Sequence, residues 1–359
     1  MSMIEDSLAR AAELRGRGQL AAAASVLDAA ARQDRDPVLP ILKEFLESLQ
    51  AIEHGITFRY IPEGSFVMGS ADGDADEAPP HEVSLPGYWV SDVPLSWSAC
   101  ARVLGWPEPP DQPTKEQVEQ LGRAVGGSEK VPPAFNYFAD VKIRLQYCED
   151  DTLHARDWHA HDQAGRWMSA GKEVTSQEMF GAPERSSTDP YRYDKKPMVA
   201  VDWGFADFIA KRMSTDAIAY RLPTEAEWER AARGCFPSSP YPWGDAPPDA
   251  TRADFDRFKE FSIRPSRTFP PNDYGLYGLA GGVWEWCADD YDATFYMRSP
   301  RESPVCRLPD SVKGREHVFR GGSWADCADA IRTSFRSSAA HSGSPNIGFR
   351  LVRVPSRSL

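Results

Sequence analysis

The sequence predicts an α+β fold with little regular secondary structure, preceded by an α-helical segment. Eleven tryptophans and thirty prolines among 359 residues are typical of a domain built from loops that aromatic side chains hold in place. The first fifty residues show helical spacing of apolar side chains, whereas short alternating runs between turns follow from residue 56. These three observations exclude a helical bundle and an array of long strands.

The composition restricts the partners and the compartment. Acidic residues outnumber basic ones by 53 to 41, and the formal charge of −12 disfavours binding to nucleic acid. No apolar run reaches the roughly eighteen residues of a membrane span, and no basic stretch followed by an apolar core opens the chain. The six cysteines lack paired CxxC spacing and are expected to be free thiols. We therefore expect a cytoplasmic protein that binds neither nucleic acid nor a membrane.

Residues 1–55 are expected to form a helical, tetratricopeptide-like leader. Apolar side chains between residues 14 and 30 lie at helical spacing, Asp36 and Pro37 are expected to end a second segment, and residues 41–52 to form a third amphipathic helix. A single repeat of this kind cannot bury its own apolar face. It must therefore dock on the main body, on a second subunit or on a partner protein, and a helical hairpin packed on the domain is the simplest interpretation.

Residues 56–354 are expected to form one domain with an insertion at about residues 106–196. The run 58–69 alternates between apolar and polar side chains, is punctuated by Gly64 and Gly69, and predicts short strands between turns. Residues 81–90 predict another strand. A loop of the insertion's length without any structure would be anomalous. We therefore expect helices within it, such as one over residues 115–125.

Two helices are expected after the insertion. Residues 201–212 have helical spacing. Thr224 and Glu227 have the spacing of a capping box, and the glutamates that follow Thr224 stand in the first turn, where the helix dipole favours them. The sequence therefore predicts a helix that begins after Thr224 and continues through Arg233.

A series of motifs in fixed order makes the chain recognisable. They are 61–70 (IPEGSFVMGS), 221–229 (RLPTEAEWE), 241–245 (YPWGD), 275–286 (GLYGLAGGVWEW), 320–324 (RGGSW) and 346–352 (NIGFRLV). Their order and spacing resemble the sulfatase-modifying-factor family, typified by the formylglycine-generating enzyme, over about residues 56–105 and 197–354. The resemblance implies a C-type-lectin-like fold with a small twisted sheet and long loops. Five tryptophans inside the motifs are expected to be buried in the core of this fold and to hold its loops in place: Trp228, Trp243, Trp284, Trp286 and Trp324.

The resemblance also implies a copper site, which this sequence lacks in part. The formylglycine-generating enzyme needs two cysteine thiolates on the segment after the Gly-Gly-Ser motif, and soft thiolates select Cu(I). Cys327 lies near the place of the first cysteine, shifted by about one residue, while the second place falls at Ile331 or Arg332. Cys306 would have to reach in from another loop. Standard oxidase activity is therefore not expected, and Cys327 is the catalytic candidate only if the chain is an enzyme.

A structural calcium ion is implied by the resemblance as well. Backbone carbonyls and carboxylates suit Ca²⁺. Matched motif to motif, Glu285 and the carbonyls of Gly281 and Val283 remain, while Gly278 replaces the usual Asn or Asp. Asp254 is expected to serve a second calcium site.

Three histidines in the insertion form another metal candidate. His154, His159 and His161 lie within eight residues, and imidazoles with nearby carboxylates suit zinc or iron. However, their spacing matches neither a helix face nor a zinc finger. Solvated loop histidines, or a hydrogen-bonding or pH-sensitive role, are the alternatives.

The segment 324–345 is expected to form a ligand-binding face, because small and polar side chains there alternate with isolated aromatics, as in antibody paratopes. The alternative is the ordinary closing hairpin of a lectin-like core. Arg332 and Arg336 are expected to hold the loops together by hydrogen bonds to carbonyls, and only secondarily to contact a ligand. The candidate ligand-binding residues are Trp324, Asp326, Arg332, Ser334, Arg336, His341 and Asn346.

Three functions follow from these observations. The leading hypothesis is a lectin-like domain that binds a protein or peptide, an effector or interaction module whose N-terminal helices dock on a partner. The alternative is a metal-dependent oxidoreductase, using copper at Cys327 or non-haem iron at the histidines of the insertion. The third is a variable protein of a diversity-generating retroelement, in which a near-copy of the DNA encoding residues 324–345 should lie nearby.

Overall fold

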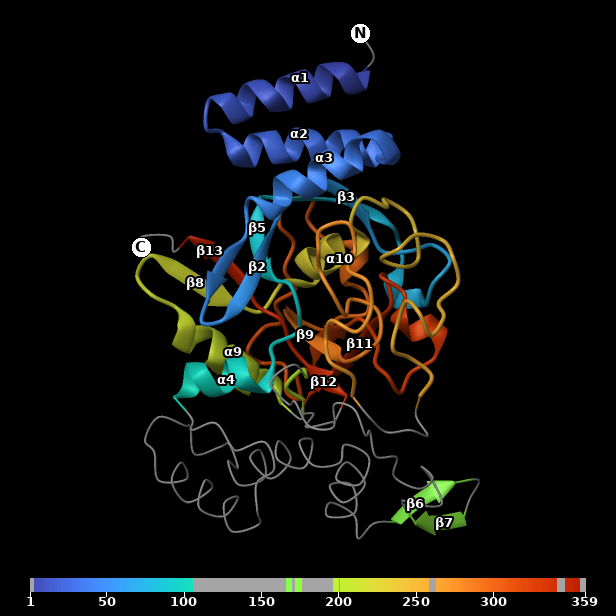
Figure 1. The fold of residues 1–359 in the computed structure, drawn as a ribbon. Helices are drawn as coiled ribbons and strands as arrows, with labels where there is room; N and C mark the ends of the chain where they lie inside the picture. The colour runs from blue at the N-terminus through green and yellow to red at the C-terminus, as the bar shows by residue number, and fades with distance from the viewer. Residues whose placement is uncertain are drawn as a thin grey trace.

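The computed structural model shows a mixed helix-and-strand fold with two curled sheets (Figure 1). It describes residues 3–105, 166–169, 172–175, 196–199, 201–257, 263–340 and 346–355. The helix expected over residues 115–125 lies outside the described residues.

The larger sheet has five antiparallel strands in the order β1-β2-β5-β13-β8. These strands are β1 (Ala51–Glu53), β2 (Ile56–Ile61), β5 (Tyr88–Ser91), β8 (Ile218–Arg221) and β13 (Val352–Pro355). Because β13 pairs with both β5 and β8, the last described strand closes the sheet between segments that are far apart in the sequence.

The smaller sheet carries the candidate site and has the order β11-β10-β9-β12. Its strands are β9 (Trp284–Asp290), β10 (His317–Arg320), β11 (Arg336–Ala339) and β12 (Ile347–Gly348). Only the β12–β9 pair in it is parallel. Two hairpins complete the described strands: β3 (Gly64–Met68) with β4 (His81–Leu85), and β6 (Arg166–Ser169) with β7 (Lys172–Thr175).

The single strand predicted over residues 81–90 is wrong, because two strands occupy this run. β4 pairs with β3, and β5 pairs with β2 in the larger sheet. Pro86 and Gly87 separate them. Proline has no backbone N–H to donate to a ladder, and a Cβ at Gly87 would collide with the Tyr60 hydroxyl.

In the described part of the main body, the α-helices are α4 (Trp97–Leu104), α9 (Trp203–Met213) and α10 (Glu225–Arg233). The capping box at α10 is confirmed: Thr224 Oγ1 accepts from the Glu227 backbone N–H at 3.1 Å, and Glu227 accepts from the Thr224 N–H at 2.8 Å. The predicted helix 201–212 is α9, which Asp202 caps. Every residue of α10 is buried although five of its nine are charged, so those charges need partners inside the protein.

Three N-terminal helices stack above the larger sheet, with α1 outermost (Figure 1). They are α1 (Met3–Gly16), α2 (Leu20–Gln33) and α3 (Arg35–Glu47). The predicted boundaries of the third helix are wrong. Pro37 lies in its first turn, where a missing N–H does no harm, and Asp36 suits that turn. Ile52 belongs to β1.

The leader docks on the main body, one of the three arrangements expected. Leu27, Leu42 and Phe45 share one apolar cluster with Tyr60 of the larger sheet and Trp228 of α10. The three helices therefore extend the core of the domain. Among the described residues, no helix combines the length and apolar character that crossing a membrane requires.

Tryptophans fill the space between the elements, as the motifs predict. Trp228, Trp286 and Trp324 are fully buried, and the Trp286 ring meets the Phe319 ring edge-to-face at 5.2 Å. Trp243 is the exception, because its ring is only half-buried.

Candidate functional site

The C-terminal loop joins β10 to β11 and contains the short helix η4 (Ala328–Ile331). Arg320 and Arg336 stand opposite each other in the two strands, and both guanidiniums turn toward α10. Glu225 receives them both: Arg320 Nη1 lies 3.0 Å from its Oε1, and Arg336 Nε and Nη2 lie 2.6 and 3.0 Å from its two oxygens. Every side chain of this trio is at most 4% exposed.

A second glutamate extends this arrangement. Glu229 accepts from Arg320, from Arg233 at 2.7 Å and from the Gly69 backbone N–H at 2.8 Å. We call the five side chains Glu225, Glu229, Arg233, Arg320 and Arg336 the buried Arg–Glu network.

Electrostatics in the network follow from burial and from close opposite charges. Burial by itself raises the pKa of Glu225, but the guanidiniums of Arg336 and Arg320 outweigh it and hold that pKa below its ordinary value. Asp289 lies beside the network and accepts from the Glu225 backbone N–H at 2.8 Å. Burial and the Glu225 charge raise the pKa of Asp289 to about 7.

The acidic loop of residues 71–80 is clamped onto the C-terminal loop. Glu77, at the end of η1 (Ala75–Glu77), accepts two hydrogen bonds of 2.7 Å from Arg332. Arg336 also donates to the Asp76 carbonyl at 2.8 Å. Arg332 and Arg336 thus hold loops together, as expected from the sequence, although carboxylates rather than carbonyls accept most of their hydrogen bonds.

Most of the residues that the sequence predicts to bind a ligand are buried or are hydrogen-bonded to other residues of the loop. Trp324, Ser334 and Arg336 are buried. Asp326 accepts from the Ser323 backbone N–H at 3.0 Å. Asn346 Nδ2 donates to the Ser323 hydroxyl at 3.0 Å, and His341 lies outside the described residues.

The exposed part of the loop is a smaller surface than the sequence predicts. Cys327 and Asp329 are exposed and Arg332 is half-buried. The buried Tyr241 ring supports the half-buried Trp243 ring in a stack at 5.2 Å. The Tyr241 pKa is raised by burial and then by Asp329 and Cys327, which lie nearby. We call these five residues the tip surface.

The places expected for a second thiolate cannot supply one. Ile331 is fully buried in an apolar cluster with Tyr241 and Ala280. Arg332 is ion-paired with Glu77. Cys306 is buried, and its backbone N–H donates to Asp289. Within the described ranges, no group of three or more His, Cys, Asp or Glu side chains is arranged to hold a metal ion. His154, His159 and His161 lie outside these ranges, so a site there stays a prediction.

We expect Cys327 to react with iodoacetamide much faster than the other four cysteines that the structure describes. Cys100, Cys235, Cys287 and Cys306 are buried, and burial raises the pKa of the last three, to about 12 for Cys306. Peptide mass spectrometry of the native protein measures the rates. Full modification of all sites after unfolding is the control, and equal rates at Cys306 and Cys327 in the native state would contradict the expectation.

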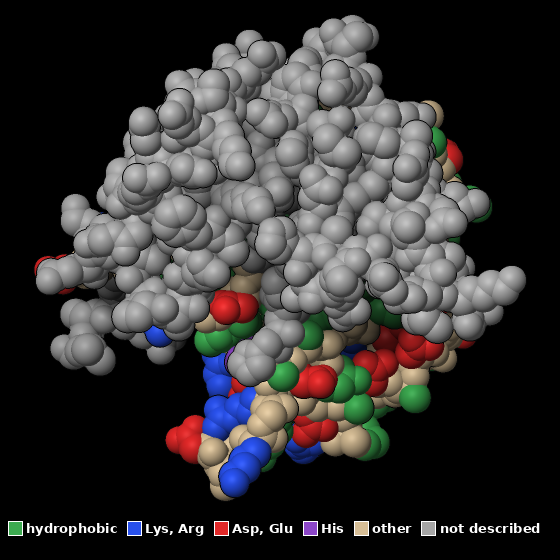
Figure 2. Space-filling view, turned by 90° about the horizontal axis from the view of Figure 1, so that it is seen from below, with side chains coloured by type: hydrophobic (Ala, Val, Ile, Leu, Met, Phe, Trp, Pro, Cys, Tyr) green, Lys and Arg blue, Asp and Glu red, His purple; other side chains and the backbone are tan. Residues whose placement is uncertain are grey.

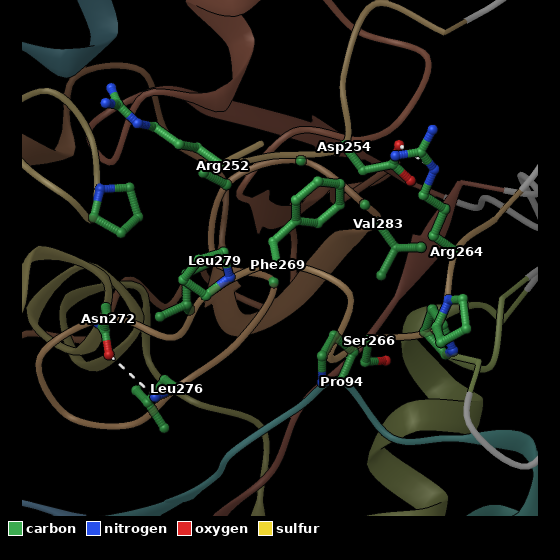
Figure 3. Close-up of a pocket in the computed structure, with 18 of the residues that line it drawn as sticks. Pro94, Arg252, Asp254, Arg264, Ser266, Phe269, Asn272, Leu276, Leu279 and Val283 are labelled. Carbon is green, nitrogen blue, oxygen red and sulfur yellow. Dashed lines mark hydrogen bonds and ion pairs between the residues drawn. The ribbon is translucent and has the colours of Figure 1, made fainter. Parts of the chain in front are cut away.

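Some of the residues expected to bind calcium line a small cavity (Figure 3). Its volume is about 50 Å³, and Asp254, Gly278, Gly281 and Val283 are among its lining residues. Glu285 is not among them. Both oxygens of that carboxylate are engaged, by Arg350 at 2.5 and 2.7 Å and by Trp228 Nε1 at 2.7 Å. This arrangement does not fit a calcium ligand.

A larger groove of about 540 Å³ was not predicted. It lies between the start of α4, the end of β5 and residues 265–268, and its polar lining includes Asp92, Ser96, Arg102 and Arg267. Arg267 Nη2 lies 2.5 Å from Asp92 Oδ2. These residues come from separate segments without a common motif, so no local pattern in the sequence brings them together.

The face seen in Figure 2 is partly formed by described residues, and there basic and acidic side chains lie among apolar ones. Within the part in view, the two signs of charge are interspersed.

Comparisons with known proteins agree with the arrangement of the motifs. Residues 53–355 match the family described as the sulfatase-modifying factor enzyme 1-like domain. The chain is 36% identical over 316 residues to the formylglycine-generating enzyme of Streptomyces coelicolor, covering 81% of this chain and 87% of that protein. It is 28% identical over 323 residues to the inactive C-alpha-formylglycine-generating enzyme 2 of Mus musculus, covering 83% and 86%.

Another relative is much longer than this chain. The serine/threonine-protein kinase pkn1 of Chlamydia pneumoniae is 30% identical over 280 residues, which cover 77% of this chain and 34% of the kinase. The chain thus spans about a third of the length of that relative. Among solved structures, PvdO from Pseudomonas aeruginosa superposes with a TM-score of 0.52 at 21% identity, covering 85% of this chain and 97% of that one, which supports the fold alone.

Proposed function

Since the chain belongs to the family of sulfatase-modifying factor enzyme 1-like domains, we propose that it is a ligand-binding member with a protein or peptide ligand. One observation supports this over two-thiolate copper oxidation. The positions where a second thiolate is required hold Ile331, which is buried among apolar side chains, and Arg332, which Glu77 neutralises. An isoleucine and an ion-paired arginine donate no electron pair to copper.

The tip surface is the proposed contact area. The half-buried Trp243 ring, backed by the buried Tyr241 ring, is the aromatic part that a ligand can reach, and Asp329 adds an exposed carboxylate. The Arg332–Glu77 pair and the buried Arg–Glu network fix the loop beneath. A rigid frame that presents aromatic and small polar side chains loses little entropy on binding. We expect a ligand that carries an apolar side chain next to a basic group.

A peptide-display selection on the immobilised full-length chain tests this proposal. We expect enriched peptides to lose about tenfold or more in affinity for Asp329→Arg, because repulsion replaces attraction at the contact. Asp216→Arg makes the same charge change on the exposed turn before β8 and should leave the affinity unchanged. Enriched peptides that bind Asp329→Arg and the wild-type chain equally well would place the ligand elsewhere.

Metal analysis separates this proposal from the oxidoreductase alternative. Protein purified without chelator is expected to hold less than stoichiometric copper and iron, with no change in Cys327→Ser. Stoichiometric copper lost in Cys327→Ser, or stoichiometric iron lost in His159→Ala, would establish the alternative. The identity of 36% to a formylglycine-generating enzyme is the reason to carry out both measurements.

A partner for the N-terminal helices remains a second proposal. All three helices contribute to the core, whereas Arg10 and Glu13 of α1, and Arg17 just after it, are exposed. Binding of a partner is best tested with substitutions at these exposed residues. Removal of residues 1–52 would also expose apolar surface of the main body and so change more than the partner contact.

A further inference from the structure

The cavity in Figure 3 contains one carboxylate from the expected calcium residues, that of Asp254. Its side chain is 3% exposed. Its backbone carbonyl accepts from the Gly282 N–H at 2.8 Å, which holds this segment against the glycine-rich turn of residues 278–283. The carboxylate thus lies at the wall that Gly281 and Val283 also line.

Two arginines already supply positive charge to this carboxylate. Arg257 Nη1 lies 2.5 Å from Asp254 Oδ1, and its side chain is only 13% exposed. Arg264 Nε lies 3.7 Å from the same oxygen, and Figure 3 shows the Arg264 guanidinium beside the Asp254 carboxylate. The Arg257 backbone N–H donates to the Trp324 carbonyl at 2.7 Å, so this arginine is held in place by the core.

Glu285, the other carboxylate implied for calcium, has the same kind of partner. Arg350 binds both of its oxygens, and the two side chains are 0% exposed. The Arg350 guanidinium also donates to the carbonyls of Ser91 and Tyr277 at 3.0 and 2.8 Å. It therefore joins three segments around one carboxylate and occupies both oxygens of Glu285. Since Arg350 belongs to the family motif 346–352, this pair is not specific to this chain.

We propose that arginine side chains replace calcium at Asp254 in this chain, with Arg257 and Arg264 supplying the positive charge there. Calcium requires six to eight oxygen ligands. Gly278 contributes no side-chain oxygen, and a divalent ion at Asp254 would lie close to two guanidiniums that repel it. The inference rests on family membership and these contacts, and it is independent of the proposed ligand.

The first test is calcium dependence of the thermal unfolding of the full chain. We expect the same Tm in calcium chloride and in EGTA. A calcium ion bound to the native state at about 100 times its Kd would raise the Tm by several degrees, and such a rise would overturn the proposal. Calcium titration by calorimetry, with no saturable heat expected, checks the result without heating.

The second test asks whether the guanidinium charge at Asp254 is needed. Arg257→Met is expected to lower the Tm in both buffers, because it leaves a buried carboxylate with a weaker counter-charge. Arg257→Lys keeps the charge and should retain more of the stability. Arg252→Met is the matched control, since Arg252 lines the same cavity but pairs with Asp249 at 3.6 Å. A Tm unchanged in Arg257→Met, or equally lowered in Arg257→Lys, contradicts the proposal.

Discussion

Replacement of Asp28 by alanine is expected to lower the free energy of unfolding by about 3–5 kcal/mol. Asp28 lies in α2 and is 2% exposed. Its Oδ2 accepts from Arg230 of α10 at 2.7 Å and from Arg32 at 3.1 Å, and its Oδ1 accepts from the Tyr274 hydroxyl at 2.5 Å. Without this carboxylate, the fully buried Arg230 guanidinium loses its counter-charge.

The effect is large because Asp28 and its partners Arg230 and Tyr274 form a contact between the leader and the main body. Burial raises the pKa of Asp28, while the Arg32 charge and the Tyr274 hydroxyl act in the opposite direction. Arg32 in turn donates to the Gly234 carbonyl at 2.7 Å. Loss of Asp28 is thus expected to loosen α2 from α10 as well as to weaken the fold.

Chemical denaturation measures the change in free energy, and limited proteolysis of residues 48–55 reports on the docking. Arg10→Ala is the control, because its pair with Glu13 is exposed and contributes about 0–1 kcal/mol. The double variant Asp28→Leu/Arg230→Met should recover part of the loss, since apolar side chains of similar volume often replace a buried pair without penalty. The expectation would be refuted if Asp28→Ala lowered the free energy of unfolding by no more than Arg10→Ala does.

Replacement of Glu225 by glutamine is expected to lower the free energy of unfolding by a similar amount, about 3–5 kcal/mol. Glu225 is the one carboxylate to which both Arg320 and Arg336 are bonded, and all three side chains are at most 4% exposed. Glutamine keeps the shape but removes the charge. Arg320 then keeps only Glu229, which already binds Arg233, and Arg336 loses the carboxylate that it binds.

The effect of Glu225→Gln should depend on pH. Because the folded-state pKa of Glu225 lies below its ordinary value, its contribution is present above the unfolded-state pKa and is lost as pH falls through the folded one. The difference between wild type and variant should therefore shrink in acid. Denaturation curves at several pH values measure it, with Glu82→Gln, from an exposed pair with Arg301, as control. A difference that grows toward low pH would contradict this assignment.

Local patterns predicted part of the fold well. The Thr224–Glu227 capping box and the α9 periodicity depend on neighbours in sequence, so the corresponding helices are where they were expected. The Pro86–Gly87 break and the start of α3 before Pro37 were missed. In both cases, the residue types permit two backbone arrangements, and pairing or packing with distant segments decides between them.

The candidate site was predicted only by position along the chain. The sequence singled out the loop after the Gly-Gly-Ser motif, and Arg336 and Trp324, which were expected at its surface, are buried. Their partners come from other segments of the chain. Arg336 binds Glu225, and the Trp324 carbonyl accepts from the Arg257 backbone N–H. Glu77 was not recognised as a partner of Arg332, because nothing in the acidic loop distinguishes it from its acidic neighbours.

The sequence by itself determined the family, the order of the motifs and the absence of cysteine at Ile331 and Arg332, because these are properties of residue identity and spacing. Tertiary structure alone decided which charges meet. It placed Asp28 on Arg230, Glu225 on Arg336 and Arg257 on Asp254. The physical reason is that a buried charge requires a counter-charge within a few ångströms, and in a loop-rich fold that counter-charge often comes from a segment remote in the chain.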